Sequence, residues 1–257
     1  MRRQGGRAAI LLLLAVTVPA CRGGGEKRAG GEKRASTTTG PANTNPSATL
    51  NPADVNPADF TAKIDHPLVA FSLNPLTVFE GTERDSETGK SVKSGFEQHL
   101  LDKTEVVAGV PVSVVEVKDY ENGKLVEHTF DYYAQHRDGS VWYFGERIDE
   151  YEDGKVSHEG QWMAGERDAK PGLFMPAEPK VGQEFQQERA PGVAEDRSTV
   201  LEVGLQVTTP AGAFTNCIKT KDFAPLQRTT EFKYYCSGVG LVREETEGGR
   251  VDLIRRG

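Results

Sequence analysis

Along the middle of the chain, runs rich in Val, Tyr, Phe and Trp are separated by turn signals at nearly even spacing. The signals are the dipeptides Asn122-Gly123, Asp138-Gly139 and Asp153-Gly154, which favour two-residue hairpin loops because both positions tolerate a positive φ. Runs that alternate with such loops are typical of an antiparallel meander. We therefore expect four consecutive strands, at residues 112–120, 124–137, 140–152 and 155–163.

Further strands are expected on both sides of this meander, at residues 76–84, 91–102, 183–189, 198–208, 214–223, 229–236, 240–246 and 250–255. No run of ten or more residues carries a helical period. Three prolines in residues 171–179 predict an irregular crossing loop. A sheet of about a dozen strands has to curl, split into two layers or close. The sequence thus predicts an all-β fold, with one domain at residues 60–257 built on a strongly curved or barrel-like antiparallel sheet.

The first twenty residues have the layout of an export signal, with a basic head and an apolar run at residues 8–18. This run is much shorter than the roughly 20 residues that a spanning helix needs. The sequence Val18-Pro19-Ala20-Cys21 resembles the lipobox of bacterial lipoproteins. That resemblance implies cleavage after Ala20 and a lipid on the sulfur of Cys21, which would anchor the protein to a membrane. The alternative is an ordinary cleaved signal in which Cys21 is incidental.

Residues 21–59 are polar, with a tandem Gly-Gly-Glu-Lys-Arg-Ala repeat followed by a stretch rich in Thr, Asn and Pro. Such a composition cannot bury enough apolar surface to offset the entropy of ordering, so we expect a disordered linker. Without residues 1–20, the basic residues fall from 31 to 28 against 38 acidic ones. This acidic balance argues against nucleic acid or an anionic lipid surface as a partner.

Cys217 and Cys236 lie on two predicted consecutive strands, and the midpoint between them falls in the turn-prone residues 225–228. A simple hairpin centred there would place the two side chains opposite each other on one face, as a disulfide requires. An exported chain is commonly oxidised, so we interpret the pair as a disulfide. A pair of free thiols or a redox pair is the alternative.

The predicted meander has aromatic side chains on both of its faces. The two-residue loops place Tyr132 and Tyr143 on one face and Tyr133, Trp142 and Phe144 on the other, with Trp162 opposite Gly145. An antiparallel sheet usually has one wet face, so something has to cover the second one. Two interpretations are left open: packing within the core and a pocket for an apolar ligand. The candidate ligand-binding residues are Tyr132, Tyr133, Trp142, Tyr143 and Phe144.

No catalytic, metal or cofactor motif is found, so no catalytic residue and no cofactor is expected. The five histidines have neither the spacing nor the cysteine neighbours of a metal site; they are His66, His99, His128, His136 and His158. The polar run Glu195-Asp196-Arg197 is interpreted as a turn with a local ion pair, and a hydrolytic site there is the alternative.

Several phrases resemble an uncharacterised family of bacterial exported proteins and lipoproteins, over about residues 110–257. They are Asp131-Tyr132-Tyr133-Ala134-Gln135, Val141-Trp142-Tyr143-Phe144-Gly145-Glu146, Pro191-Gly192-Val193-Ala194-Glu195-Asp196, and Tyr234-Tyr235 with Gly238-Val239-Gly240-Leu241-Val242. The resemblance transfers no functional residue.

We expect a lipid-anchored envelope protein that binds an apolar ligand or an envelope component, such as another envelope protein, without catalysis. A structural or protein-interaction module and a hydrolase are the alternatives.

Overall fold

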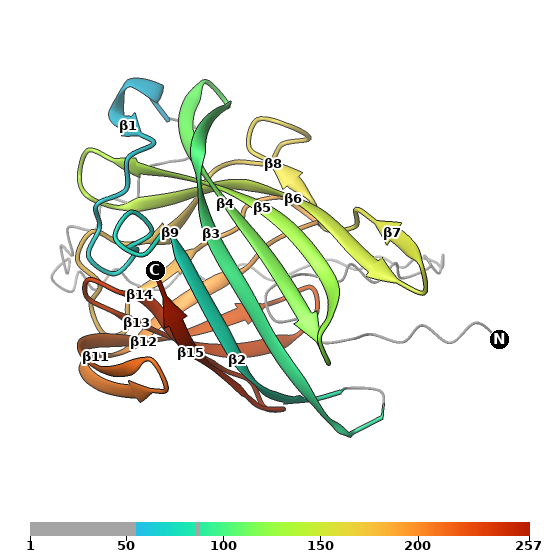
Figure 1. Cartoon of the computed structure of the whole chain (residues 1–257). Helices are drawn as coiled ribbons and strands as arrows, with labels where there is room; N and C mark the ends of the chain where they lie inside the picture. The colour runs from blue at the N-terminus through green and yellow to red at the C-terminus, as the bar shows by residue number, and fades with distance from the viewer. Residues whose placement is uncertain (1–54, 86–87) are drawn as a thin grey trace, which may run out of the picture.

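The structure is a computed structural model that describes residues 55–85 and 88–257. The predicted signal segment, Cys21 and nearly all of the expected linker lie outside these residues. The described part is all-β, as predicted, and forms one antiparallel sheet of fifteen strands (Figure 1). The strands are β1 (Phe60–Thr61), β2 (Leu76–Arg84), β3 (Ser91–Val107), β4 (Val110–Glu121), β5 (Lys124–His136), β6 (Val141–Glu152), β7 (Lys155–Ser157), β8 (Trp162–Met163), β9 (Gly172–Met175), β10 (Glu184–Gln186), β11 (Arg197–Thr209), β12 (Gly212–Ala224), β13 (Thr229–Cys236), β14 (Gly240–Glu245) and β15 (Arg250–Arg256).

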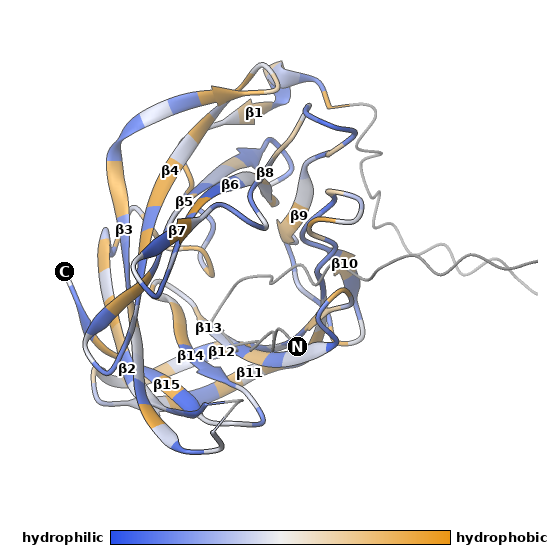
Figure 2. Cartoon of the chain, turned by 90° about the vertical axis from the view of Figure 1, so that its right-hand side faces the viewer, coloured by the Kyte–Doolittle hydropathy of each residue, from blue (hydrophilic) through white to orange (hydrophobic). Residues whose placement is uncertain are grey.

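The sheet is strongly curved, which confirms the predicted architecture. Its order is β10-β11-β12-β13-β14-β15-β2-β3-β4-β5-β6-β7, with β1 added to β5 and with β8 and β9 added to β6. The two ends of the curl meet where β9 contacts β10. At that seam a Cβ on Gly172 would lie 1.9 Å from the Gln187 carbonyl oxygen, so only glycine permits the approach. Figure 2 shows the curl end on, with β2 to β4 on one side and β9 and β10 on the other.

Two of the three predicted hairpin loops have the expected geometry. Asn122-Gly123 has φ values of 49° and 78°, and Asp153-Gly154 has 47° and 75°. At Asp138-Gly139 only the glycine has a positive φ. There the His136 N–H bonds to the Ser140 carbonyl oxygen, so the loop holds three residues and not two.

Three of the predicted elements are wrong in extent. The strand expected at residues 91–102 continues to Val107, because it bends through an irregular register after Leu100 while still pairing with β4. The strand expected at residues 155–163 is divided into β7 and β8, which pair with different parts of β6. The crossing loop expected at residues 171–179 contains β9, since only Pro171, Pro176 and Pro179 lack a backbone N–H and the residues between can pair.

A β-bulge corrects the predicted faces of the meander. Tyr132 pairs with Gly145, but Tyr133 pairs with Tyr143, so β6 carries one extra residue at this point. The extra residue changes the alternation, and Tyr133 and Tyr143 share a face on which their rings stack at 4.8 Å. The prediction had placed these two tyrosines on opposite faces. Trp162 lies opposite Glu146 and not Gly145, which pairs with Met163.

Cys217 and Cys236 are directly opposite each other on β12 and β13, as the sequence predicted. Their Cα atoms are 4.0 Å apart and the structure joins the two sulfur atoms in a disulfide. Both residues are fully buried. The bond links β12 to the end of β13.

One end of the curl is closed by the segment between β1 and β2, which we call the strap (residues 62–75). Ile64, Leu68 and Val69 of the strap belong to the hydrophobic core. The strap is fixed to the β13–β14 turn, because the Gly238 N–H bonds to the Pro67 carbonyl oxygen. Among residues 55–85 and 88–257, no helix is long and apolar enough to cross a membrane.

Candidate functional site

The inner face of the curved sheet is unusually rich in carboxyl groups. In an antiparallel ladder, directly paired residues project to the same face. One inner row runs across eight strands, through Val200, Thr220, Lys233, Glu244, Val251, Gly81, Ser94 and Glu121. A neighbouring row runs through Leu253, Phe79, Phe96, Asp119, Glu127 and Glu150. The curl thus brings acidic residues from distant parts of the chain into one enclosed space.

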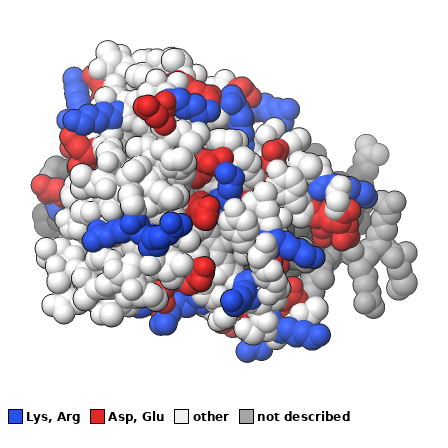
Figure 3. All heavy atoms as spheres, in the orientation of Figure 1, with Lys and Arg blue, Asp and Glu red and all other residues white. Residues whose placement is uncertain are grey.

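Buried charge in the described ranges is strongly unbalanced. Lys233 is the only buried Lys or Arg there, against seven buried acidic residues of the interior: Asp119, Glu127, Asp131, Glu146, Glu188, Asp222 and Glu244. Asp252 is also buried, but it lies on the outer face opposite Glu80 and pairs with Arg243 and Arg250. The outer surface differs, since Lys, Arg, Asp and Glu are interspersed on the face shown in Figure 3. Burying a carboxylate without a counter-charge is costly, so each carboxyl group of the interior must either pair with a cation or be protonated.

Lys233 on β13 neutralises part of this charge. Its Nζ lies 3.4 Å from an Asp222 carboxylate oxygen, 3.6 Å from one of Glu231 and 4.0 Å from one of Glu244. Burial opposes the charge on the amine, but these three carboxylates outweigh it and raise the pKa of Lys233 well above its usual range. Lys233 is therefore a fixed cation, and its charge also opposes the rise in the pKa of Asp131, Glu188 and Asp196.

A second carboxyl pair is bridged by a tyrosine. The Tyr143 hydroxyl oxygen lies 2.6 Å from Asp131 Oδ1 and 3.1 Å from Glu146 Oε2. A hydroxyl carries a single proton and can donate to only one of these oxygens. For both contacts to be hydrogen bonds, one of the two carboxyl groups must carry a proton and donate it to the tyrosine oxygen. A neutral carboxylic acid at one of these two residues would satisfy both contacts.

Burial raises the pKa of the inner carboxyl groups in general. It is the largest cause of the shift in Glu83, Asp119, Glu127, Asp131, Glu146, Glu188, Asp196 and Glu244. The pKa of Asp131 rises to about 7 and that of Glu127 to about 8, and neighbouring carboxylates add to the shift of Glu127. In the absence of a bound cation, several of these groups are neutral acids at neutral pH.

Asp119 and Thr220 are polar side chains of the interior that have no partner. Neither carboxyl oxygen of Asp119 has a hydrogen-bond partner, although the residue is only 4% exposed. The Thr220 hydroxyl, in the inner row beside Lys233, is also unpartnered, and the residue is 1% exposed. Buried polar groups are nearly always hydrogen-bonded, so each of these unpaired groups needs an explanation. The His, Cys, Asp and Glu residues that the structure describes form no group of three that could hold a metal ion.

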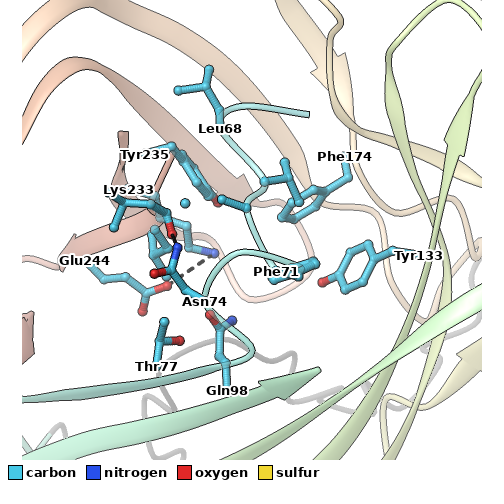
Figure 4. A pocket seen from close by; sticks show the side chains of 15 residues that line it. Leu68, Phe71, Asn74, Thr77, Gln98, Tyr133, Phe174, Lys233, Tyr235 and Glu244 are labelled. Atoms are coloured by element: carbon cyan, nitrogen blue, oxygen red, sulfur yellow. Dashed lines mark hydrogen bonds and ion pairs between the residues drawn. The ribbon is translucent and has the colours of Figure 1, made fainter. Parts of the chain in front are cut away.

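A small cavity lies between the strap and the inner face (Figure 4). Its free volume is about 30 Å³, and its lining includes Phe71, Tyr133, Lys233, Tyr235 and Glu244. Such a space holds one or two water-sized groups and is far smaller than the pockets of drug-sized ligands. In Figure 4 the strap residue Phe71 and the ring of Tyr133 project toward each other at one side of the cavity.

The five aromatic candidates from the sequence are all buried, and only one of them lines this cavity. Tyr133 does so, while Tyr143 packs edge to face against Trp162 and bonds the inner carboxyl pair. Phe144 and Trp142 lie against Phe60, and the ring of Tyr132 lies under the Arg147 guanidinium group. Most of this aromatic set is core material and not the lining of an open pocket.

The five histidines lie in four separate places, and two of them share one carboxylate. His128 and His99 both approach Glu116, on the outer face of β4. His158 lies beside Asp149, and His136 beside Asp138 in a hairpin loop. His66 is buried in the strap, and burial lowers its pKa.

The polar run Glu195-Asp196-Arg197 has two separate environments. Glu195 accepts a hydrogen bond from the Gly192 N–H, which fits the predicted turn. Asp196 points into the acidic interior, and burial raises its pKa to about 7.

The acidic interior as a whole was not predicted from the sequence. The available signal was the position of acidic residues such as Asp119 at the same parity as the valines Val115 and Val117.

A second, more open hollow of about 950 Å³ lies on the outer face of β15, β2, β3 and β4. Its lining includes Pro210 and charged residues of both signs, such as Glu80, Lys93, Glu97 and Arg250. With Asp252 it has three acidic and two basic residues, so its charge is mixed, in contrast to that of the interior.

No protein-family model matches the chain, and no curated protein matches it. The chain is similar to a solved structure of a protein provisionally described as a lipoprotein from Parabacteroides distasonis. The two share 12% identity with a TM-score of 0.40, over 76% of this chain and 100% of that chain. At this identity and score the likeness assigns no role to any residue.

Proposed function

We propose that the protein is a lipid-anchored component of the bacterial cell envelope that binds a small ligand inside its curved sheet, without catalysis. One observation carries the binding part: a buried wall of carboxyl groups in which several oxygens, including both of those of Asp119, have no hydrogen-bond partner. The anchoring part rests on the lipobox-like sequence at Cys21. In this proposal residues 1–20 are removed, residues 21–59 link the lipid to the domain, and residues 60–257 bind.

The chemistry of the interior favours a polar ligand over the apolar one expected from the aromatic faces. Four of the five aromatic candidates are occupied by partners within the core, and the cavity that Tyr133 reaches also contains Lys233 and Glu244. An apolar molecule placed there would leave these charged groups without compensation.

We propose no catalysis because the acid groups that could perform it are buried away from solvent. Asp131 is 2% exposed and Glu146 is fully buried. A hydrolase needs its acid and base within reach of both substrate and water.

The proposal is tested by expressing the full chain in a bacterium that processes lipoproteins, with a Cys21→Ser variant as control. We expect the wild-type chain in the membrane fraction, with an intact mass that shows loss of residues 1–20 and addition of acyl chains such as palmitate. The variant should be released from the membrane. Native mass spectrometry of the wild-type chain should show a retained small ligand. A soluble wild-type chain without acyl mass would refute anchoring, and a chain that neither retains nor takes up any small molecule would refute binding.

The outer hollow favours a second candidate, an envelope protein-interaction module. Its volume of about 950 Å³ and its mixed charges suit a polypeptide segment better than a small ion. Substitution of Arg250 by Glu would then abolish crosslinking to an envelope protein while leaving the interior unchanged.

A further inference from the structure

We infer that His66 is a proton-sensitive latch of the strap, and that protonation of its ring in mildly acidic surroundings opens the cavity beneath the strap. The inference rests on the proposed function, because it describes the regulation of the same binding site. It starts from two contacts of the His66 ring, which together fix its protonation state.

The strap is the roof of the small cavity. Leu68, Phe71 and Asn74 of the strap line the cavity, and so do Lys233 and Glu244 of the inner face (Figure 4). Residues 62–75 form no strand or helix, so no ladder of backbone hydrogen bonds joins them to the sheet. A segment held by separate contacts opens more easily than a paired strand. Each contact that holds the strap therefore controls access to the cavity.

The His66 ring fastens the strap to the seam of the curl. Its Nε2 lies 3.1 Å from the carbonyl oxygen of Pro176, which follows β9 directly. Its Nδ1 accepts a hydrogen bond from the Leu68 N–H at 3.1 Å. The residue is 3% exposed, so water satisfies neither nitrogen while the strap is closed.

These two contacts require a neutral ring. A backbone N–H is always a donor, so Nδ1 has to carry a lone pair and the ring proton has to lie on Nε2, which donates it to Pro176. The imidazolium form carries a proton on both nitrogens, and its Nδ1–H would point at the Leu68 N–H. The buried Leu68 N–H would then lose its acceptor. The charged ring satisfies both of its own N–H groups by moving into water, which takes the strap away from Pro176.

The groups around His66 do not compensate a positive charge. Burial has the largest effect and lowers the pKa of His66 from its usual value of 6.5. Backbone groups of Ala177 and Pro176 and the carboxylate of Asp65 favour the charged ring, but burial outweighs them. Within the described residues, Asp65 is the only charged group that acts on the ring. Gln135 on β5, which accepts from the His66 N–H, is neutral.

The direction of the pH dependence follows from the lowered pKa. Above pH 6.5 the ring is neutral in both the open and the closed strap, and closure is fully favoured. As the pH falls below 6.5, the open strap takes up a proton that the closed strap does not, so closure weakens. The inner carboxyl groups behave in the opposite way, because their raised pKa values make the folded sheet more stable in acid. Mild acid should therefore loosen the strap while the sheet beneath it stays intact.

The test is hydrogen–deuterium exchange of the full chain at pH 7.5 and pH 5.0, with rates corrected for the intrinsic effect of pH on exchange. We expect the strap to lose about tenfold in protection at pH 5.0, which is the order of change that one lost buried hydrogen bond causes. Peptides from β4 and β5 should keep their protection. Unchanged protection of the strap, or an equal loss over the whole sheet, would overturn the inference.

His66→Gln is the decisive variant, because its amide can still donate to Pro176 and does not titrate in this range. Its strap should have the same protection at both pH values. His158→Gln is the matched control, since His158 lies beside Asp149 outside the strap, and this variant should behave as wild type. A loss of strap protection at pH 5.0 that is as large in His66→Gln as in wild type would assign the effect to another group and overturn the latch.

A measurement on the wild-type chain decides the question if His66→Gln does not fold. Long-range proton–nitrogen NMR should show the His66 proton on Nε2 at pH 7.5 and a titration midpoint below 6.5. A proton on Nδ1, or a midpoint above 6.5, would contradict the latch.

Native mass spectrometry at the same two pH values connects the latch to binding. A small ligand that the wild-type chain retains at pH 7.5 should be lost at pH 5.0, and His66→Gln should keep it. Retention by wild type at both pH values would overturn the regulation. A chain that neither retains nor takes up a small molecule at pH 7.5 would refute the proposed function, whereas the exchange and NMR results judge the latch without any ligand.

Discussion

Replacement of Glu83 by Gln should remove a measurable part of the pH dependence of stability. Glu83 lies on the inner face of β2, where the hydroxyls of Ser94 and Thr246 donate to its two oxygens at 3.1 and 3.3 Å. Burial raises its pKa from 4.5 to about 7, and repulsion by Glu231 adds to the shift while both hydrogen bonds oppose it. Glutamine has nearly the same shape: one hydroxyl can still donate to its oxygen, and the other can rotate to accept from its NH2 group.

The sign of the effect follows from the raised pKa. Below pH 4.5, Glu83 is protonated in both the folded and the unfolded chain, and the stability that goes with its neutral form is fully present. Between pH 4.5 and 7 the unfolded chain releases the proton but the folded chain holds it, so the free energy of unfolding falls. The loss is complete above the folded pKa of about 7. At 1.36 kcal/mol for each pKa unit, Glu83 costs the folded state about 3 kcal/mol at pH 8.

Glu83→Gln should therefore match wild type at pH 4.5 and exceed it by about 3 kcal/mol at pH 8, which corresponds to a rise in Tm of roughly 6–12 °C. Thermal melting followed by circular dichroism at both pH values measures the difference. Glu80→Gln, on the exposed face of the same strand, is the control and should change Tm little at either pH. If Glu83→Gln and wild type lose the same stability between pH 4.5 and 8, the group is not buried in its charged form as argued.

Three further changes test other parts of the structure. Lys233→Met leaves the three carboxylates around it without a counter-charge, so urea denaturation should show a loss of about 3–5 kcal/mol at pH 8 and a smaller one at pH 5; equal losses would contradict the pairing. Reduction of Cys217–Cys236, which closes a separation of 19 residues, should lower stability by about 3 kcal/mol in melts with and without reductant, and an unchanged Tm would exclude the bond. Gly145→Ala places a Cβ 2.3 Å from the Trp162 carbonyl oxygen at φ 128°, so urea unfolding followed by tryptophan fluorescence should show a loss of about 1–3 kcal/mol, and wild-type stability would refute the close approach.

The fold could be predicted from local signals along the chain. Asn122-Gly123 and Asp153-Gly154 fix hairpins at the turn itself, so strands β4 to β7 followed from a few residues. The pairing of Cys217 with Cys236 followed from their equal distance to one turn. Curvature followed from the number of strands alone, because a sheet of this size cannot remain flat.

The candidate site could not be predicted, because it depends on contacts between distant strands. Asp119 and Glu244 lie 125 positions apart in the sequence, and both belong to the inner face only because β15 pairs with β2. The bulge between Tyr132 and Tyr133 changed the aromatic faces, and nothing local in the sequence marks it apart from Gly145. The sequence does show that Asp119 falls on the same face of its strand as Val115 and Val117. It does not show which residues lie on the opposite wall, and an acidic site can be recognised only when those are known.

The most direct test of the account is the ionisation state of Asp119, because its carboxyl group is buried without a partner among other carboxyl groups. Carbon-13 NMR of side-chain carboxyl groups, assigned with Asp119→Asn, reports this state in the full chain at pH 7. We predict the carboxyl signal of a neutral acid, since burial and the neighbouring carboxylates raise the pKa of Asp119 well above its usual range. The signal of a carboxylate at pH 7 would contradict the central claim that the curved sheet encloses a wall of neutral acids.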